Sequence, residues 1–313
     1  MDLSSNRVAF DRCPDYSLHT LFECFTRFLD ACQPAHTYRS SRILIKPNLI
    51  TAGRGNLACT EGVFILAAAR FFQELGARVA VGDSPAFGTA TSVLDKIGIL
   101  PFLTRYSIPV VEFNRIRIVT LSSGVRAGLA AEALDCDLLV NLPRVKAHGQ
   151  LMVTMAVKNF FGCIGGMRKP MWHMKYGGKE GGLENLIVEL LSVLPDSITL
   201  VDGITAMHRT GPIGGQPYDL GITACSTNPV GVDRALLSVI GLEPERSPLM
   251  KACIRAGLAG TDLEQLEFPL LNPSSVQVDS FKVPAELSPV RFNPFRFVKN
   301  NLRRAFHRIG LLS

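Results

Sequence analysis

The chain has 313 residues, of which 47% are hydrophobic, so it can bury one large core or two smaller ones packed together. No apolar run reaches the roughly 18 to 20 residues that cross a bilayer, and the first residues lack the apolar core of a signal peptide. The net charge of +6 comes from residues 290–313, since the rest of the chain is balanced, and this excludes a broad nucleic-acid-binding face.

The eight cysteines are widely spaced and include no C-x-x-C pair or cluster suited to zinc or an iron–sulfur centre. We therefore expect reduced thiols, most of them buried, in a cytoplasmic protein.

The first predicted helix covers residues 18–29, where leucine and phenylalanine recur at helical spacing, and it ends near Gln33 and Pro34. A β-branched run at 42–45 predicts a strand. Thr60 is a candidate cap for a helix that runs to Leu75, Gly76 stops it, and residues 78–81 form the next strand. This order of elements is a βαβ unit.

Apolar runs at 110–113, 138–140 and 198–201 predict further strands, and helical patterns fall at 90–97, 153–161, 183–194 and 230–240. The fold class is α/β, with a mainly parallel, doubly wound, Rossmann-like sheet in an α/β domain over residues 1–289. Strands before residue 120 and after residue 195 could instead form separate sheets in two lobes. Two glycine-rich patches, 162–182 and 211–215, are predicted loops; the first also carries many basic residues and could close over a ligand.

Residues 290–313 form a basic tail in which 294–310 fit an amphipathic helix, with apolar side chains on one face and basic ones on the others. Such a helix can bind an anionic membrane or a protein partner, or dock on the chain's own core. The localisation expected is cytoplasmic, peripheral to a membrane if the tail binds lipid.

Four predicted strands each end in a polar residue: Lys46, Asp83, Asn141 and Asp202. Ligands of open parallel sheets bind beyond the carboxyl ends of the strands, so we expect these residues to border one crevice. Asp and Asn also end strands for local hydrogen-bonding reasons, so the prediction depends on the four cases together.

The segment 141–148 adds cations to this crevice. Pro143 favours extended backbone, which would place Arg144, Lys146 and His148 on one face, suited to phosphate or carboxylate groups. His148 could titrate near neutral pH as a general acid or base. Lys158, on the next predicted helix, either returns toward the crevice or complements the carboxyl end of its helix.

Together and in this order, several motifs resemble the family called domain of unknown function 362 over about residues 40–245. They are Lys46-Pro47-Asn48, Val81-Gly82-Asp83-Ser84, Asn141 to His148, Val157-Lys158-Asn159, Val201-Asp202-Gly203-Ile204 and Gly211-Pro212. The resemblance implies the fold and the choice of positions rather than a reaction. Many members look like redox proteins with ferredoxin-type cysteine clusters, which this chain lacks.

The leading hypothesis is an enzyme that binds a small anionic metabolite carrying carboxylate or phosphate and performs acid–base chemistry of the isomerase, racemase or lyase type. Predicted binding residues are Lys46, Asn48, Asn141, Lys146, Lys158 and Asn159, and predicted proton-transfer residues are His148, Asp83 and Asp202. One alternative is an oxidoreductase that uses a bound flavin or a partner's electrons. Another is a non-catalytic anion-binding module brought to membranes by the tail. The sequence identifies no cofactor, and histidine spacing gives no support for a metal site.

Overall fold

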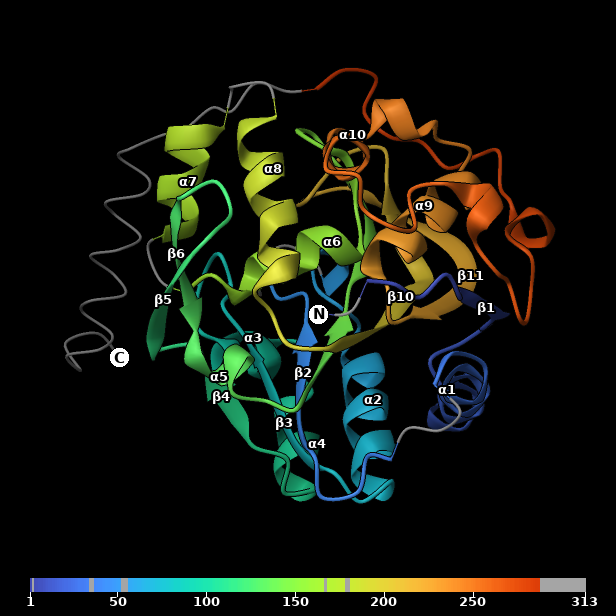
Figure 1. Ribbon diagram of the computed structural model, residues 1–313. Helices are drawn as coiled ribbons and strands as arrows, with labels where there is room; N and C mark the ends of the chain where they lie inside the picture. The colour runs from blue at the N-terminus through green and yellow to red at the C-terminus, as the bar shows by residue number, and fades with distance from the viewer. Residues whose placement is uncertain (2, 34–36, 52–55, 166–167, 178–180, 288–313) are drawn as a thin grey trace.

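A computed structural model describes residues 1, 3–33, 37–51, 56–165, 168–177 and 181–287 of the chain. Within these residues, nine strands join in one sheet and two form a separate antiparallel pair (Figure 1). The strands are β1 (Ala9–Arg12), β2 (Arg42–Pro47), β3 (Arg78–Asp83), β4 (Val110–Glu112), β5 (Ile116–Thr120), β6 (Arg126–Ala130), β7 (Leu138–Leu142), β8 (Arg144–His148), β9 (Met152–Thr154), β10 (Ser197–His208) and β11 (Gln216–Ser226). The helices are α1 (Leu18–Cys32), α2 (Gly62–Glu74), α3 (Ala90–Lys96), α4 (Leu100–Arg105), α5 (Ala131–Leu134), α6 (Ala156–Asn159), α7 (Arg168–Tyr176), α8 (Gly182–Glu189), α9 (Pro229–Val239) and α10 (Pro248–Arg255).

The sheet has the order β1-β11-β10-β7-β2-β3-β4, and β8 and β9 extend it beside β10. From β10 to β4 the neighbouring strands are parallel, whereas β11 and β1 add an antiparallel edge. The α/β class with a mainly parallel sheet is therefore confirmed. The alternative of two separate sheets is wrong, because β7 pairs with β2 on one side and with β10 on the other.

Two apolar layers cover the two faces of this sheet. Alternate residues along a strand point to opposite faces. In β2, Ile43 and Ile45 pack into the core beneath α1 to α4, while Leu44 packs into the core beneath α6 and α8 to α10. Helices thus protect both faces, as expected for parallel strands without a solvated side.

Most of the predicted elements are present, with boundaries moved by tertiary contacts. Gly76 follows α2 with a φ of +85°, which glycine adopts without the steric penalty of a Cβ. The cap of α2 is Glu61 rather than Thr60, because the Thr60 hydroxyl instead donates a hydrogen bond to the Leu142 carbonyl oxygen at 2.6 Å.

The helix predicted at 153–161 is wrong in its first part. Residues 152–154 form β9, which pairs with β8, and α6 begins only at Ala156 before continuing as a 3-10 turn. The glycine-rich loop at 162–182 contains the helix α7. The predicted tail helix at 294–310 lies outside the described residues. In the part of the chain that the structure describes, no helix is long and apolar enough to cross a bilayer.

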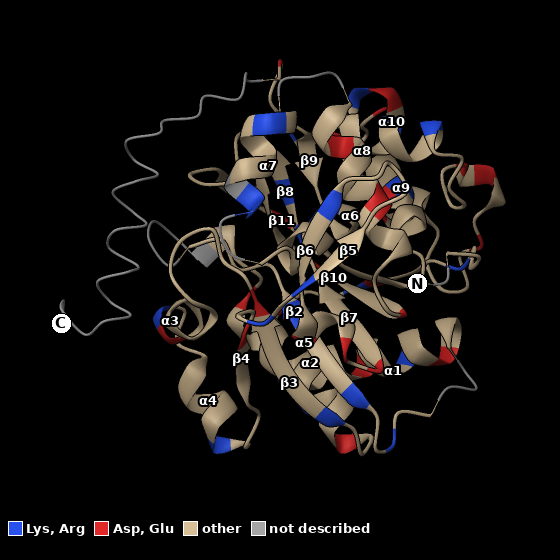
Figure 2. Ribbon diagram, turned by 60° about the vertical axis from the view of Figure 1, so that its left-hand side comes forward, with Lys and Arg blue, Asp and Glu red and all other residues tan. Residues whose placement is uncertain are grey.

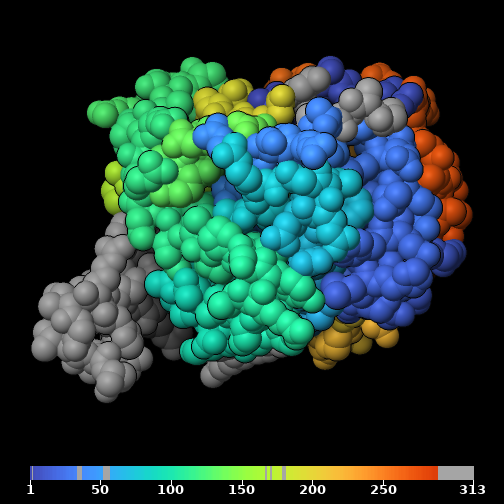
Figure 3. Space-filling view, turned by 90° about the horizontal axis from the view of Figure 1, so that it is seen from below, coloured from blue at the N-terminus to red at the C-terminus, as the bar shows by residue number. Residues whose placement is uncertain are grey.

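The carboxyl ends of β2 and β3 point toward the middle of the molecule, between α1 to α4 below and α6 to α10 above (Figure 1). The opposite face, seen from below in Figure 3, consists mainly of residues from the first half of the chain. The polar strand ends therefore lie inside the molecule, away from that face.

Candidate functional site

A buried ion pair joins the ends of two adjacent parallel strands. The Lys46 Nζ lies 2.8 Å from the Asp83 Oδ1, and the two side chains are 0% and 3% exposed. The second carboxylate oxygen accepts a hydrogen bond from the Leu49 backbone N–H at 2.8 Å. Because β2 and β3 run in parallel register, their carboxyl ends meet at one edge, which confirms that Lys46 and Asp83 lie together.

Two buried amides continue from this ion pair toward the centre of the sheet. The Asn159 side chain donates to the Asn141 Oδ1 at 2.8 Å and accepts from the Lys46 Nζ at 3.5 Å. Asn141 sits on the central strand β7 and also donates to the Thr199 hydroxyl at 3.2 Å. Buried amides that are hydrogen-bonded in this way hold one another in fixed orientations.

Gly162 allows α6 and the following turn to approach the ion pair. A Cβ at this position would lie 2.3 Å from the Lys46 Nζ and 2.4 Å from the Asp83 Oδ1, closer than any van der Waals contact. Glycine is therefore favoured here by space rather than by backbone conformation, because a Cβ would force the Lys46 or Asp83 side chain to move.

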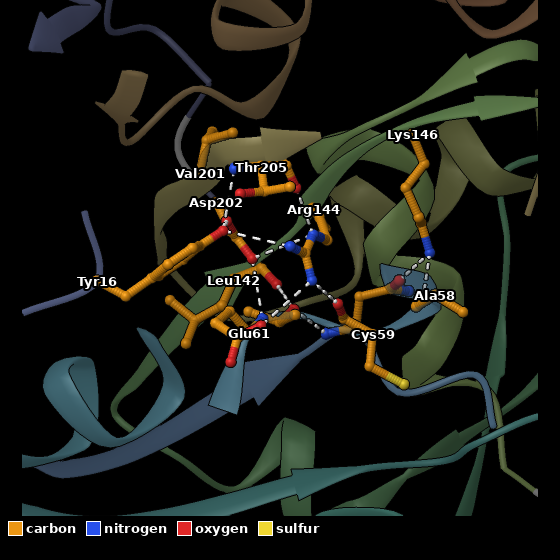
Figure 4. Close-up of polar contacts among 12 residues, drawn as sticks. Tyr16, Ala58, Cys59, Glu61, Leu142, Arg144, Lys146, Val201, Asp202 and Thr205 are labelled. Atoms are coloured by element: carbon orange, nitrogen blue, oxygen red, sulfur yellow. Dashed lines mark hydrogen bonds and ion pairs between the residues drawn. The ribbon is translucent and has the colours of Figure 1, made fainter. Parts of the chain in front are cut away.

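Lys146 lies on β8 with its side chain 2% exposed. Its ammonium donates to the Asn48 Oδ1 and, at 2.8 Å, to the Ala58 carbonyl oxygen (Figure 4). The pKa of Lys146 is lowered to about 7, chiefly by burial and also by the positive charges of Arg144 and Lys46, while Cys59 and Asp83 oppose this shift. Neither of these two hydrogen-bond partners is charged, so this amine is costly to keep in the protonated form.

Lys158 is the second lysine with a lowered pKa. It projects from α6 over the Phe161 ring, with its Nζ 4.3 Å from the ring centroid. Its pKa is lowered to about 7. Burial is the largest cause, and the positive charges of Lys169, Lys146 and Lys46 act in the same direction. Lys158 as a whole is half-buried, whereas Lys46 and Lys146 are fully buried, and burial of its ammonium is the largest cause of the lowered pKa.

The helix α7 adds two residues that were not among the predicted site residues. Lys169 donates a hydrogen bond to the Ser84 carbonyl oxygen, directly after β3. His173 packs edge-on against Phe161, with the ring centroids 5.5 Å apart, and burial lowers its pKa to about 4. The basic, glycine-rich composition of residues 162–182 was the only sequence signal for this contribution.

The extended conformation predicted for 141–148 is confirmed by β7 and β8. The expectation that His148 titrates near neutral pH is wrong. Burial lowers its pKa well below the ordinary value, and the charges of Lys158, Lys146 and His173 lower it further. The imidazole is therefore neutral, and because its Nδ1 accepts a hydrogen bond from the Gln150 backbone N–H at 3.1 Å, the proton sits on Nε2.

Asp202 belongs to a neighbouring network centred on Arg144 (Figure 4). Its carboxylate accepts hydrogen bonds from the Tyr16 hydroxyl at 2.7 Å and from the Glu61 backbone N–H at 2.9 Å, and lies 3.5 Å from the Arg144 Nε. Arg144 in turn donates to the Thr205 and Cys59 carbonyl oxygens, each at 2.8 Å. These internal contacts tie β8 and β10 to the segment before α2.

Asp233 holds the amino terminus of α6 in place. Its two carboxylate oxygens accept hydrogen bonds from the Ala156 and Val157 backbone N–H groups at 2.7 and 3.0 Å. Burial raises the pKa of Asp233 to about 7 against the opposing effect of those two hydrogen bonds. The position of Lys158 and Asn159, the next two residues of α6, therefore depends on a carboxylate from α9.

The structure thus gathers Lys46, Asn48, Asp83, Asn141, Lys146, Lys158 and Asn159 into one region at the strand ends, together with Lys169. We call these eight residues the lysine cluster. Figure 2 shows basic segments on β2, β8 and α7 in this part of the molecule. Asp202 lies beside the cluster in its own network. Among the described residues, no three His, Cys, Asp or Glu side chains are grouped as metal ligands.

Comparison with solved structures gives two partial likenesses. One is to the lactate racemase apoprotein from Thermoanaerobacterium thermosaccharolyticum, with 13% identity and a TM-score of 0.44 over 64% of this chain and 52% of that chain. The other is to a structural genomics target from Thermotoga maritima, with 12% identity and a TM-score of 0.42 over 64% of this chain and 53% of that chain. The chain spans about half the length of these two proteins.

Sequence comparison is more specific. The chain is 36% identical over 294 residues to a thylakoid-associated protein of Synechocystis sp., covering 93% of this chain and 90% of the relative. Residues 43–238 match the family described as Domain of unknown function (DUF362), and this range contains every member of the lysine cluster. The chain therefore belongs to the DUF362 family.

Proposed function

We propose that the lysine cluster is the active site of an enzyme that binds a small carboxylate- or phosphate-bearing metabolite and moves a proton on it. The reaction class is isomerisation, racemisation or elimination. The observation that carries the proposal is the imbalance of charge: four lysines and one carboxylate, Asp83, meet in a largely buried region.

Such an imbalance of charge destabilises the ligand-free protein and favours the binding of an anionic ligand. A buried cation loses its hydration, and without a carboxylate partner the electrostatic attraction inside the protein does not compensate for that loss. Asp83 is already paired with Lys46 at 2.8 Å, which leaves Lys146 and Lys158 with neutral partners among the contacts described above. A bound anion would supply the missing negative charge and raise the pKa of both lysines.

The two lowered lysine pKa values also supply the proton chemistry. At neutral pH an amine with a pKa of about 7 is divided between its two forms, which suits a group that accepts and returns a proton. In our assignment Lys158 is the proton-transfer group, because this residue is half-buried whereas Lys146 is fully buried, and Lys146 holds the anion. The Nε2–H of neutral His148 donates a hydrogen bond to the substrate. Asp83 fixes Lys46, and Asp202 positions Arg144.

Native mass spectrometry of freshly purified protein, followed by proton exchange in heavy water, tests this function. The protein is incubated with a panel of small 2-hydroxy acids, dicarboxylates and phosphate esters, and loss of a carbon-bound proton signal is followed by NMR. We expect exchange with at least one compound, at least 100-fold slower with Lys158→Met and unchanged with Lys251→Met, an exposed control on α10. Equal exchange by the Lys158→Met variant would remove the basis of the assignment.

We also propose that the tail, residues 294–310, brings the protein to an anionic membrane surface. The support is its basic amphipathic sequence together with the name of the thylakoid-associated relative. Sedimentation with vesicles containing anionic lipid should pellet the full chain, and the double variant Arg303→Glu and Arg304→Glu should remain in solution. Equal pelleting of both proteins, or pelleting of neither, would contradict the proposal.

A further inference from the structure

Four of the eight cysteines lie in two pairs along the seam between α1 and the antiparallel edge of the sheet. Cys24 and Cys32 belong to α1, Cys13 follows β1 directly, and Cys225 belongs to β11. Figure 1 shows α1 beside β1. Within each pair the thiols are near enough to influence one another electrostatically, Cys13 with Cys24 and Cys32 with Cys225, and the Cys32 thiol donates a hydrogen bond to the Cys225 carbonyl oxygen. All four are free thiols in this structure.

The two pairs differ in their access to solvent. Cys13 and Cys24 are both fully buried. Cys32, at the end of α1, is only half-buried, while its partner Cys225 is fully buried. The Cys32 Sγ lies 3.7 Å from the Cys225 carbonyl oxygen, so the Cys32 side chain reaches β11 at the residue that carries its partner thiol. A solvent reagent can therefore reach one member of this pair, with the second member in contact behind it.

We propose that Cys32 and Cys225 form a reversible disulfide, with Cys32 as the attacking thiol and a hydroperoxide as the oxidant. This site is separate from the lysine cluster and does not depend on its function. The pKa of Cys32 is lowered, first by the hydrogen bond from Cys225, and the charge of Arg7 acts in the same direction. A larger thiolate fraction at Cys32 favours attack on a peroxide.

The reaction has two balanced steps. The Cys32 thiolate attacks a peroxide oxygen, the O–O bond breaks, and Cys32 becomes a sulfenic acid while the peroxide leaves as hydroxide or alkoxide that takes up a proton. The Cys225 sulfur then attacks the Cys32 sulfur, the S–O bond breaks, and hydroxide leaves with the Cys225 proton as water. Two thiols are oxidised by two electrons in total, and one peroxide is reduced.

The disulfide would connect residues 193 positions apart and fix the end of α1 to β11. Closing so long a loop restricts the unfolded chain strongly. We therefore expect the oxidised protein to unfold at a higher urea concentration than the reduced protein, with the difference abolished by dithiothreitol.

The test uses the full chain treated with hydrogen peroxide and analysed by intact-mass and non-reducing peptide mass spectrometry. We expect a mass loss of two hydrogen atoms and a cross-linked peptide that contains Cys32 and Cys225. Cys136→Ser is the matched control, because Cys136 is similarly half-buried and its thiol donates to the carbonyl oxygen of Ala133, a residue without a thiol. The cross-link should persist in Cys136→Ser and be lost in Cys32→Ser.

Cys225→Ala provides a second variant in which the attacking thiol remains. It should accumulate Cys32 sulfenic acid, which dimedone traps, without an intramolecular cross-link. The proposal is overturned if Cys32 oxidises in the wild-type protein without joining Cys225, or if the cross-linked peptide contains only Cys13 and Cys24.

Discussion

Replacement of Lys146 by methionine should stabilise the ligand-free protein at neutral pH, because it removes a buried charge at nearly constant side-chain volume. The pKa of Lys146 falls from 10.5 to about 7 on folding. The unfolded chain therefore binds a proton that the folded protein binds weakly, and the folded state is penalised wherever the pH lies below 10.5. At 1.36 kcal/mol per pKa unit, the penalty is about 4 kcal/mol at pH 7 and about 2 kcal/mol at pH 9.

The lost hydrogen bonds work in the opposite direction. Lys146 donates to Asn48 and to the Ala58 carbonyl oxygen, and their loss should cost about 1 kcal/mol each at either pH. The Lys146→Met variant should then be about 2 kcal/mol more stable than the wild-type protein at pH 7 and nearly equal to it at pH 9. Because the pKa of Lys146 is lower in the folded protein than in the unfolded chain, the stability of the wild-type protein rises relative to the variant as the pH increases from 7 toward 10.5.

Equilibrium urea unfolding, followed by far-ultraviolet circular dichroism at pH 7, 8 and 9, measures this difference. Lys251→Met, an exposed substitution on α10, controls for the added methionine and should show no comparable trend. If the difference in the free energy of unfolding between wild type and Lys146→Met stays constant within about 0.5 kcal/mol over this range, protonation of buried Lys146 does not destabilise the folded protein and the reasoning is refuted.

Three further substitutions test the surroundings of the site. Gly162→Ala places a Cβ against the buried ion pair and should lower stability by about 1–3 kcal/mol in urea unfolding, and an unchanged midpoint would show that the ion pair yields easily. Asp233→Asn removes a carboxylate whose pKa is raised to about 7, so wild-type stability should fall relative to the variant by about 3 kcal/mol between pH 4 and 7, and a flat difference would contradict this. Arg144→Met leaves Asp202 buried without its cation and should cost about 3–5 kcal/mol, which a thermal melt would detect as a lower midpoint; an unshifted midpoint would show that the Tyr16 and backbone contacts suffice.

The site residues could be predicted from sequence where one geometric rule applies. Lys46, Asp83 and Asn141 each follow a short apolar run, and parallel strands bring such positions to a common edge. The same rule predicted Asp202 as a site residue, but it does not say which side chains from neighbouring strands contact each strand end. Only the packing of β8 against β10 decides that Asp202 contacts Arg144 and Tyr16 instead of the ion pair.

Local sequence determined the elements whose hydrophobic pattern is strong: the amphipathic α1, the apolar β2 and β3, and the glycine stop after α2. The tertiary structure decided the rest. Residues 152–154 have a pattern that also fits a helix, and their pairing with β8 makes them a strand. The tertiary structure also decided the pKa values of Lys146, Lys158 and His148, because these values depend on burial and on charges brought close by segments distant in sequence. Desolvation is a property of the folded environment, which the order of residues along the chain does not specify.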